Sequence, residues 1–210
     1  ISYLKREQYG NRPLFKGQYF DAELIKQEES RINYKKGEEK YEVKEKKFRY
    51  VFDPKRSTIF PRMYSNSPNH IQRYREITNL GKNENPTFSD NLEFFFKYQI
   101  GHMYLRYFMW NFAGKQNDVQ GHGDFLNGNW LSGIDAIDEL RLGNRDTLTQ
   151  EMQENKGLNK FFYLPLILGL IGIVFQTIRD PRGAGIVALL FIMTGAAIVV
   201  YLNQAPLQPR

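Results

Sequence analysis

Residues 161–178 read FFYLPLILGLIGIVFQTI, and residues 183–202 read GAGIVALLFIMTGAAIVVYL. Neither run contains a charged side chain, and a helix of about 17–25 such residues crosses the hydrocarbon core of a bilayer. Only the four residues RDPR separate the two runs, so the two helices must run antiparallel. The pattern predicts a transmembrane helical hairpin over residues 161–202. The alternative is a helix pair in a soluble core, which would need a large partner surface because both helices are apolar on all sides.

The preceding residues, 1–160, have the composition of a polar module outside the bilayer. Mean hydropathy over the whole chain is −0.54 although both apolar runs are included. Cysteine is absent, which excludes disulfides and thiolate metal sites. The formal net charge is +6, but basic and acidic residues are interspersed over residues 1–56 instead of clustering. Interspersed signs are typical of a solvated surface, so we expect no nucleic-acid partner.

The short connection between the apolar runs sets the expected orientation in the membrane. Arg179 and Arg182 favour the cytoplasmic side by the positive-inside rule. Lys156 and Lys160 flank the other end of the first run and make this bias small. The prediction places residues 1–160 outside the cytoplasm and the 179–182 loop inside it.

The polar module is predicted to be α+β. Alternating apolar residues at 31–34 and 40–52, on either side of a glycine-containing connection, indicate a small β-hairpin. Residues 70–80 indicate a short helix that ends before Gly81. Residues 92–112 indicate a longer helix rich in Phe, Tyr and Trp. Its charged residues argue against a membrane span, and its rings suit the lipid headgroup zone or a protein core beside it.

A polar, glycine-rich loop, AGKQNDVQGHGDFLNGN, follows at residues 113–129. Loops of this kind, mounted on a rigid scaffold, often carry binding residues. Tryptophan rings can stack on sugar rings, amides can hydrogen-bond hydroxyl groups, and a guanidinium can meet a phosphate. The alternative is an ordered surface loop whose side chains satisfy one another. The candidate ligand-binding residues are Arg106, Trp110, Gln116, Asn117, Asp118, His122, Asp124 and Trp130.

Two other clusters contain groups that carry chemistry in many proteins. Asp118, His122 and Asp124 have side chains that bind metals, but their spacing matches no known metal motif, so we expect no metal. The acidic residues of the following helical stretch have basic neighbours, which favours a salt-bridged surface over a general acid or base pair. This second cluster comprises Asp135, Asp138 and Glu139 with Arg141 and Arg145. Motifs for nucleotide binding and for common hydrolases are absent.

Several blocks of the sequence resemble a bacterial family of multi-pass inner-membrane proteins. The family is mostly described as a domain of unknown function and is grouped with protein O-mannosyltransferases. The similar blocks are YLKREQYG (3–10), FPRMYS (60–65), YLRYFMWNF (104–112), QNDVQGHG (116–123), GNWLSGI (128–134) and YLNQ (201–204). They extend over nearly the whole chain, and the block from Trp110 to Trp130 is the most specific.

The resemblance implies a glycosyltransferase with a GT-C-like membrane fold. Such enzymes transfer a sugar from a polyprenyl-phosphate carrier to a protein or glycan acceptor on the extracytoplasmic face, and the sugar carrier is a substrate, so no cofactor is expected. Their catalytic acid usually lies in the first extracytoplasmic loop. Because this sequence starts without that loop and stops soon after the second apolar run, we expect an internal piece of a larger protein, with residues 203–210 starting the next loop. No catalytic residue is therefore assigned.

A rival hypothesis from another functional class stays open. The chain would then be a non-catalytic, membrane-anchored binding or assembly module. Its aromatic helix and polar loop would dock a partner protein or a polysaccharide. The partners expected under the two hypotheses together are membrane lipid, a polyprenyl-phosphate-linked sugar, and a protein or glycan acceptor.

Overall fold

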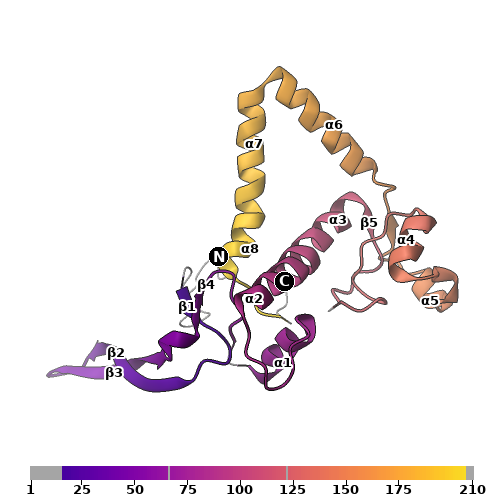
Figure 1. The fold of residues 1–210 in the computed structure, drawn as a ribbon. Helices are drawn as coiled ribbons and strands as arrows, with labels where there is room; N and C mark the ends of the chain where they lie inside the picture. Colours follow the sequence, from indigo (N-terminus) through magenta and orange to yellow (C-terminus); the bar gives the residue numbers. More distant parts are fainter. Residues whose placement is uncertain (1–15, 66, 122, 207–210) are drawn as a thin grey trace. The chain divides into compact units, whose positions relative to one another are not determined.

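The computed structural model describes residues 16–206 except 66 and 122. The chain is α+β, with short antiparallel strand pairs and helices in the order that Figure 1 shows. It divides into two compact units. The first contains Ile1–Phe95 and Val200–Arg210, and the second contains Phe96–Val199. The predicted boundary at residue 160 between a polar module and a membrane hairpin stays a prediction.

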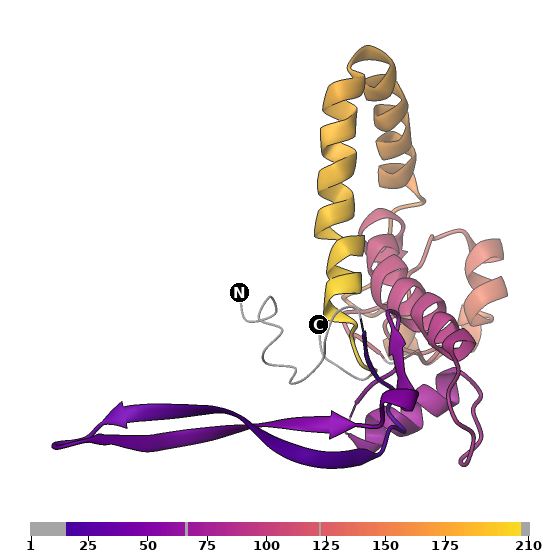
Figure 2. The same ribbon diagram turned by 60° about the vertical axis from the view of Figure 1, so that its left-hand side comes forward.

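A long antiparallel hairpin of β2 (Leu24–Lys36) and β3 (Tyr41–Phe52) dominates the first unit (Figure 2). Its pairing runs from Leu24 opposite Phe52 to Lys36 opposite Tyr41, with three register shifts. The β-hairpin predicted from sequence is confirmed, but its first strand begins at Leu24 instead of Arg31. Charged residues and a register shift between Glu29 and Arg31 interrupt the apolar alternation in this part of β2, which explains the missed start.

The core of the first unit lies beside α1 (Pro68–Ile77) and α2 (Phe88–Phe94). Tyr74 and Phe94 are buried, and their rings meet edge to face with centroids 4.8 Å apart. The backbone N–H of Met63 donates to Asn91 Oδ1 over 3.0 Å, so a buried polar group also has its partner. Beside this core, β1 (Lys16–Gln18) pairs with β4 (Ser57–Ile59), and η3 (Pro54–Arg56) precedes β4.

The aromatic helix predicted at residues 92–112 is helical and begins earlier, at Phe88. Its start is fixed by a capping box, in which the Thr87 backbone N–H donates to Asp90 Oδ2 over 2.7 Å. After α2 the chain continues as a π-helical segment, η4 (Phe95–Leu105), and then as α3 (Arg106–Phe112). Long π-helical segments are rare and often occur near functional sites.

In the second unit, the polar loop and the segment after it are tied together by short strands. β5 (Gly114–Lys115) pairs with β6 (Asn159–Lys160), and Lys115 also bridges to Trp130. α4 (Asp135–Leu142), η5 (Arg145–Thr147) and α5 (Gln150–Gln153) lie between these strands in the sequence. α4 starts only at Asp135, because Trp130 bridges to Lys115 and the Leu131 backbone N–H donates to the Gly114 carbonyl.

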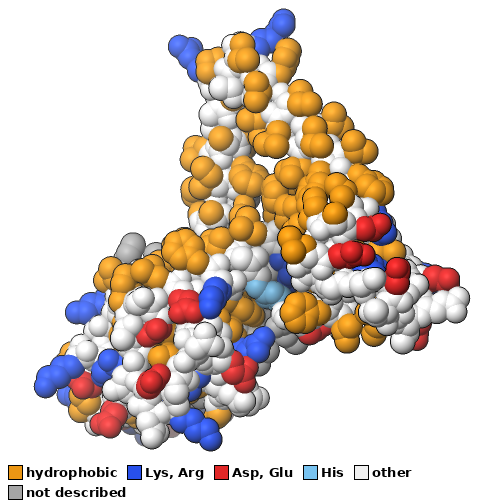
Figure 3. Space-filling view, turned by 45° about the vertical axis from the view of Figure 1, so that its right-hand side comes forward, with side chains coloured by type: hydrophobic (Ala, Val, Ile, Leu, Met, Phe, Trp, Pro, Cys, Tyr) orange, Lys and Arg blue, Asp and Glu red, His pale blue; other side chains and the backbone are white. Residues whose placement is uncertain are grey.

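The apolar runs form α6 (Leu164–Arg179), α7 (Pro181–Thr194) and α8 (Ala196–Leu202). One described helix, Pro181–Leu202, is long and apolar enough to cross a membrane, with mean hydropathy 2.5 and none of its apolar window buried. α6 is equally apolar in character but shorter. Apolar side chains cover both helices, and basic side chains lie at the turn between them (Figure 3). The transmembrane hairpin as a pair of spanning helices stays a prediction.

The turn between α6 and α7 is stabilised by Asp180. Its carboxylate accepts from the Gly183 backbone N–H over 3.0 Å and from Gln176 Nε2 over 3.3 Å. Asp180 is thus the N-cap of α7, and Pro181 occupies the first helical position, where its missing N–H costs nothing. Farther along α7, Phe191 meets Phe108 of α3 edge to face, with centroids 5.9 Å apart. The aromatic helix segment α3 therefore packs against the apolar helix.

Candidate functional site

Arg106 organises the polar loop by binding its main chain. Its Nε donates to the His102 carbonyl over 2.9 Å, and Nη1 donates to the carbonyls of Gln120, over 2.8 Å, and Gly128. The residue is only 6% exposed, and this burial lowers the pKa of the Arg106 guanidinium from its ordinary value, against a smaller opposing effect of Tyr98. Arg106 therefore holds both sides of the loop, residues 120 and 128, against α3.

Trp110 supports the same contact from the next turn of the helix. Its indole Nε1 donates to the Gly128 carbonyl over 3.1 Å, and the Arg106 guanidinium lies 5.1 Å from the centroid of its ring. Both residues were predicted as ligand contacts. The structure gives them a supporting role in the loop, and a ligand contact stays a prediction.

Three further candidates hydrogen-bond within the loop. Asn117 Oδ1 accepts from the backbone N–H groups of Val119, over 3.2 Å, and Gly128, over 3.1 Å. Gln116 donates to the Phe125 carbonyl over 3.2 Å, and Asp124 accepts from the Asn127 backbone N–H over 2.6 Å. Amide and carboxylate groups used in this way give the loop a fixed shape without regular secondary structure. Ligand binding by Gln116, Asn117 and Asp124 stays a prediction.

The other predicted candidates have different surroundings. Asp118 pairs with Lys115, and its side chain is 70% exposed. His122 lies outside the described residues. Trp130 stacks under Arg141, whose guanidinium carbon is 3.4 Å from the ring centroid, and meets the Tyr163 ring edge to face at 6.2 Å. Neither Asp118 nor Trp130 lines the cavity between α4, η5, α5 and β6. Among the described residues, no group of three or more His, Asp or Glu is placed to hold a metal ion.

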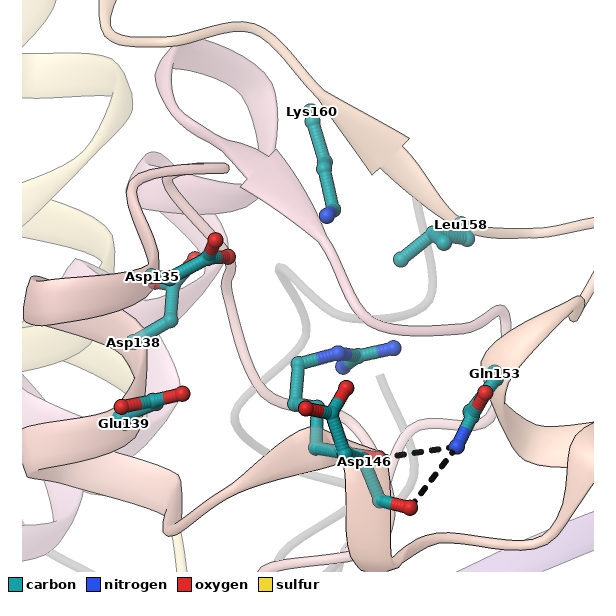
Figure 4. Close-up of a pocket in the computed structure, with 8 residues that line it drawn as sticks. Asp135, Asp138, Glu139, Asp146, Gln153, Leu158 and Lys160 are labelled. Carbon is teal, nitrogen blue, oxygen red and sulfur yellow. Dashed lines mark hydrogen bonds between the residues drawn. The ribbon is translucent and has the colours of Figure 1, made fainter.

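A cavity of about 300 Å³ lies instead between α4, η5, α5 and β6 (Figure 4). Glu139 and Lys160 point into it from different sides, and Gln153 lies across it from Glu139. Its size reaches the lower end of the range of small-molecule sites. The lining residues are Asp135, Asp138, Glu139, Arg145, Asp146, Gln153, Leu158 and Lys160.

Asp138 is a structural member of this lining. It is 2% exposed, and its Oδ1 accepts from the Ser132 backbone N–H, over 2.9 Å, and from the Ser132 hydroxyl, over 3.0 Å. Its Oδ2 accepts from the Gly133 backbone N–H over 2.9 Å. Both oxygens are thus used to fix the 132–133 turn ahead of α4.

The spacing of these acidic residues predicts a salt-bridged surface, and the structure arranges them differently. In the described part of the chain, no ion pair joins Asp135 or Glu139 to Arg141 or Arg145. Arg141 lies on Trp130, and burial there lowers the pKa of its guanidinium, opposed by the nearby Asp138 and Tyr163. Arg145 lines the cavity together with Asp135 and Glu139, whereas Arg141 is held on Trp130.

The charges of the lining select the ligands that suit the cavity. Four carboxylates face two cations, so a phosphate group is repelled on balance. The carboxylates are strong acceptors, whereas Lys160 and Arg145 are donors. Arg145 Nη1 is buried and has no hydrogen-bond partner among the described residues. A small cavity lined by both donors and acceptors suits a ligand with several hydroxyl groups, or an amine with hydroxyl groups.

Gly143 sets the path of the chain from α4 to Arg145. Its φ of 79° and ψ of 177° lie in a region that is essentially restricted to glycine. No atom lies within 4 Å of a Cβ built there, so backbone strain is the only cost of a side chain. We predict that Gly143→Ala destabilises the second unit by about 1–3 kcal/mol. A thermal unfolding midpoint measured on the detergent-solubilised chain checks this.

Gly143→Asn tests whether this position needs the glycine-only conformation or only the left-handed helical conformation that is common at helix C-termini. Asparagine tolerates the left-handed helical region, but at ψ near 180° it gains nothing over alanine. The two variants should therefore lose similar stability. Recovery of wild-type stability by Gly143→Asn would contradict the glycine-only conformation.

Residues 10–96 match the model of a family of unknown function (DUF8416). The matched segment contains the β2–β3 hairpin, α1 and α2, and it ends before α3, the polar loop and the cavity. Searches of curated proteins and of solved structures found no match.

Proposed function

We propose that this chain belongs to a membrane glycosyltransferase that transfers a sugar from a polyprenyl-phosphate carrier to a protein or glycan acceptor. The observation that carries the proposal is a polar cavity in the same compact unit as the exposed apolar helices α6 and α7. A lipid-linked sugar needs both features, a bilayer for its tail and hydrogen-bonding groups for its sugar. The reaction class itself rests on the sequence resemblance.

The cavity fits the acceptor glycan better than the carrier. Its excess of carboxylates opposes the phosphate of a polyprenyl-phosphate donor, whereas Asp135, Glu139 and Lys160 can bind sugar hydroxyl groups. In this proposal the residues of the cavity position the acceptor. The chemical step is assigned to groups outside them.

The proposed location is the bacterial inner membrane, with α6 and α7 both crossing it. The aromatic pair Trp130 and Tyr163 precedes α6, where an interfacial belt is expected, and Arg179 and Arg182 lie at the opposite end of the helix. This arrangement supports a cytoplasmic turn between α6 and α7. The cavity would then face the periplasm.

A second candidate function is a non-catalytic binding module. The hydrogen bonds within the polar loop favour it, because Gln116, Asn117 and Asp124 are used to shape the loop and Asp118 pairs with Lys115. A loop built in this way presents a fixed surface to a polysaccharide or protein. In this case the cavity binds a glycan that is not chemically changed.

The experiment that tests the proposal measures transfer of labelled sugar from a polyprenyl-phosphate donor in membranes containing the intact protein. We predict that Glu139→Gln lowers transfer about tenfold or more, because a hydrogen bond to a charged group contributes about 1.5–3 kcal/mol. Glu151→Gln is the matched control, since Glu151 is exposed on α5 and does not line the cavity.

The outcomes separate the reaction from the cavity. If transfer depends on the protein but is equal in wild type and Glu139→Gln, the proposed reaction stands and the cavity is not the acceptor site. Absence of transfer with every donor would favour the binding module. Binding of a labelled oligosaccharide, weakened by Glu139→Gln alone, would then still identify the cavity as a glycan site.

A further inference from the structure

The β2–β3 hairpin has two chemically different faces. Cross-strand partners share a face, and side chains alternate between faces except at the register shifts. One face carries the apolar side chains, including the facing pairs Tyr34 with Val43 and Leu24 with Phe52. The apolar members of this face, here called the apolar hairpin face, are Leu24, Ile32, Tyr34, Tyr41, Val43, Phe48, Tyr50 and Phe52, and the same register places Gln27, Glu29, Lys36 and Lys46 among them.

Ion pairs confirm the assignment of the faces. On the opposite, charged face, Lys35 pairs with Glu42 over 3.1 Å, and Asn33 Nδ2 donates to Glu45 over 3.3 Å. On the apolar hairpin face, Lys46 reaches Glu29 diagonally over 2.8 Å. The hairpin is thus amphipathic along its whole length.

Most of the apolar hairpin face is open in the described structure, although Phe52 meets the Tyr64 ring edge to face with centroids 6.3 Å apart. Tyr41 is 72% exposed and Tyr34 is 57% exposed, and Phe48 and Tyr50 are also exposed. Figure 2 shows the hairpin projecting away from β1, β4 and α1 of its own unit. A two-stranded hairpin is at best marginally stable alone in water, and a face this apolar calls for a covering surface.

Three observations indicate that the surface covering the apolar hairpin face is a lipid bilayer. The compact unit that contains the hairpin also contains the end of the membrane-length helix Pro181–Leu202, whose last residues belong to Val200–Arg210. Asn203, directly after that helix, donates to the Arg62 carbonyl over 2.9 Å in the buried core of the unit. This contact ties the residues that directly follow the apolar helix in the sequence to the core of the hairpin's own unit.

The composition of the hairpin supplies the other two observations. Tyrosine and phenylalanine predominate on the apolar hairpin face, and amphipathic rings such as tyrosine favour the headgroup level of a bilayer. Residues 24–52 contain nine Lys or Arg and six Glu. This excess of positive charge is attracted to anionic headgroups, and long lysine side chains can reach them while the rings are buried.

We propose that the apolar hairpin face lies on the surface of an anionic bilayer and anchors its own unit to that surface. The proposal rests on the membrane part of the proposed function and is independent of glycosyl transfer. It assigns a role to a segment within the family match. It also explains why a long two-stranded hairpin carries aromatic residues on one face only.

The test uses spin labels, which the cysteine-free sequence allows at single positions. Phe48→Cys places a label on the apolar hairpin face, and Lys47→Cys places one on the charged face of the same strand. Leu189→Cys, on exposed α7, reports whether the helix is in the bilayer. The labelled chain is reconstituted into vesicles of phosphatidylcholine and phosphatidylglycerol, and collision with oxygen and with a water-soluble nickel chelate is measured.

We predict that the ratio of oxygen to nickel collisions is several-fold higher for Phe48→Cys than for Lys47→Cys. The pair Tyr50→Cys and Arg49→Cys repeats the comparison and guards against one label distorting the hairpin. If both faces of the hairpin give equal, water-like ratios while the label at Leu189→Cys reports lipid, the hairpin proposal is overturned but α7 still lies in the bilayer. Water-like ratios at Leu189→Cys would show that α7 does not lie in the bilayer, and would overturn the hairpin proposal together with the membrane location on which it rests. Spin–spin broadening at Phe48→Cys that disappears on dilution with unlabelled protein would assign the face to a second copy of this chain.

Discussion

Arg106→Met is expected to release the polar loop and to cost about 3–5 kcal/mol of local stability. The guanidinium donates to the carbonyls of His102, Gln120 and Gly128, and the site is buried. Each buried carbonyl that loses its donor costs about 1–3 kcal/mol, and methionine fills the space without replacing any donor. The loss should appear as at least about a hundredfold faster amide exchange in peptides covering residues 116–129.

Arg106→Lys tests whether geometry or charge matters at this position. Lysine keeps the charge but lacks the planar fork that reaches two sides of the loop, so it should restore only part of the protection. Leu105→Ala, at an exposed neighbouring position, is the control and should leave the loop unchanged. If loop exchange in Arg106→Met equals that of wild type, the loop is held by its internal amide contacts alone.

The prediction of Arg106 and Trp110 as site residues shows what the sequence can and cannot specify. Arg106 and Trp110 stand out in the sequence as a cation and an indole in the aromatic helix just before the polar loop, and in the structure both donate to carbonyls of that loop. Their partners are main-chain carbonyls, which every residue possesses. Sequence alone therefore could not distinguish a group that shapes a loop from one that binds a ligand.

The secondary structure was accessible where periodicity was clear. Alternation at Tyr41, Val43, Phe48 and Tyr50 predicted β3, and the uncharged runs predicted α6 and α7. The π-helical form of η4 was not predicted, because it differs from an α-helix in its hydrogen bonds while both bury similar residues.

The cavity was not predicted because its lining comes from segments that are separated in the sequence and meet only in the folded chain. Lys160 lies in β6, whereas Asp135 and Glu139 lie in α4. The pairing of β6 with β5 brings them to the same cavity. The available signal was the surplus of acidic residues on α4 over usable basic partners. That surplus was interpreted as a salt-bridged surface because the position of Arg141 on Trp130 cannot be read from spacing.

Asp138 is the second residue whose replacement should have a large effect. It accepts three hydrogen bonds, from the Ser132 backbone N–H, the Ser132 hydroxyl and the Gly133 backbone N–H, in a buried site. Asp138→Ala leaves these three donors without their acceptor and should cost about 3–5 kcal/mol. Amide exchange at Ser132 and Gly133 reports the loss directly, because both N–H groups donate to this carboxylate.

Asp138→Asn distinguishes a carboxylate acceptor from a simple space-filling role. The asparagine amide keeps one acceptor oxygen but turns an N–H₂ group toward a backbone or hydroxyl donor, so a cost of about 1–3 kcal/mol remains. Asp135→Asn, in the first turn of the same helix, should cost less than about 1 kcal/mol because only a helix-dipole interaction is weakened. If Asp138→Asn exchanges like wild type at Ser132 and Gly133, the turn is held by packing. If it exchanges like Asp138→Ala, the turn requires both carboxylate oxygens, and the wall of the cavity depends on a buried charge.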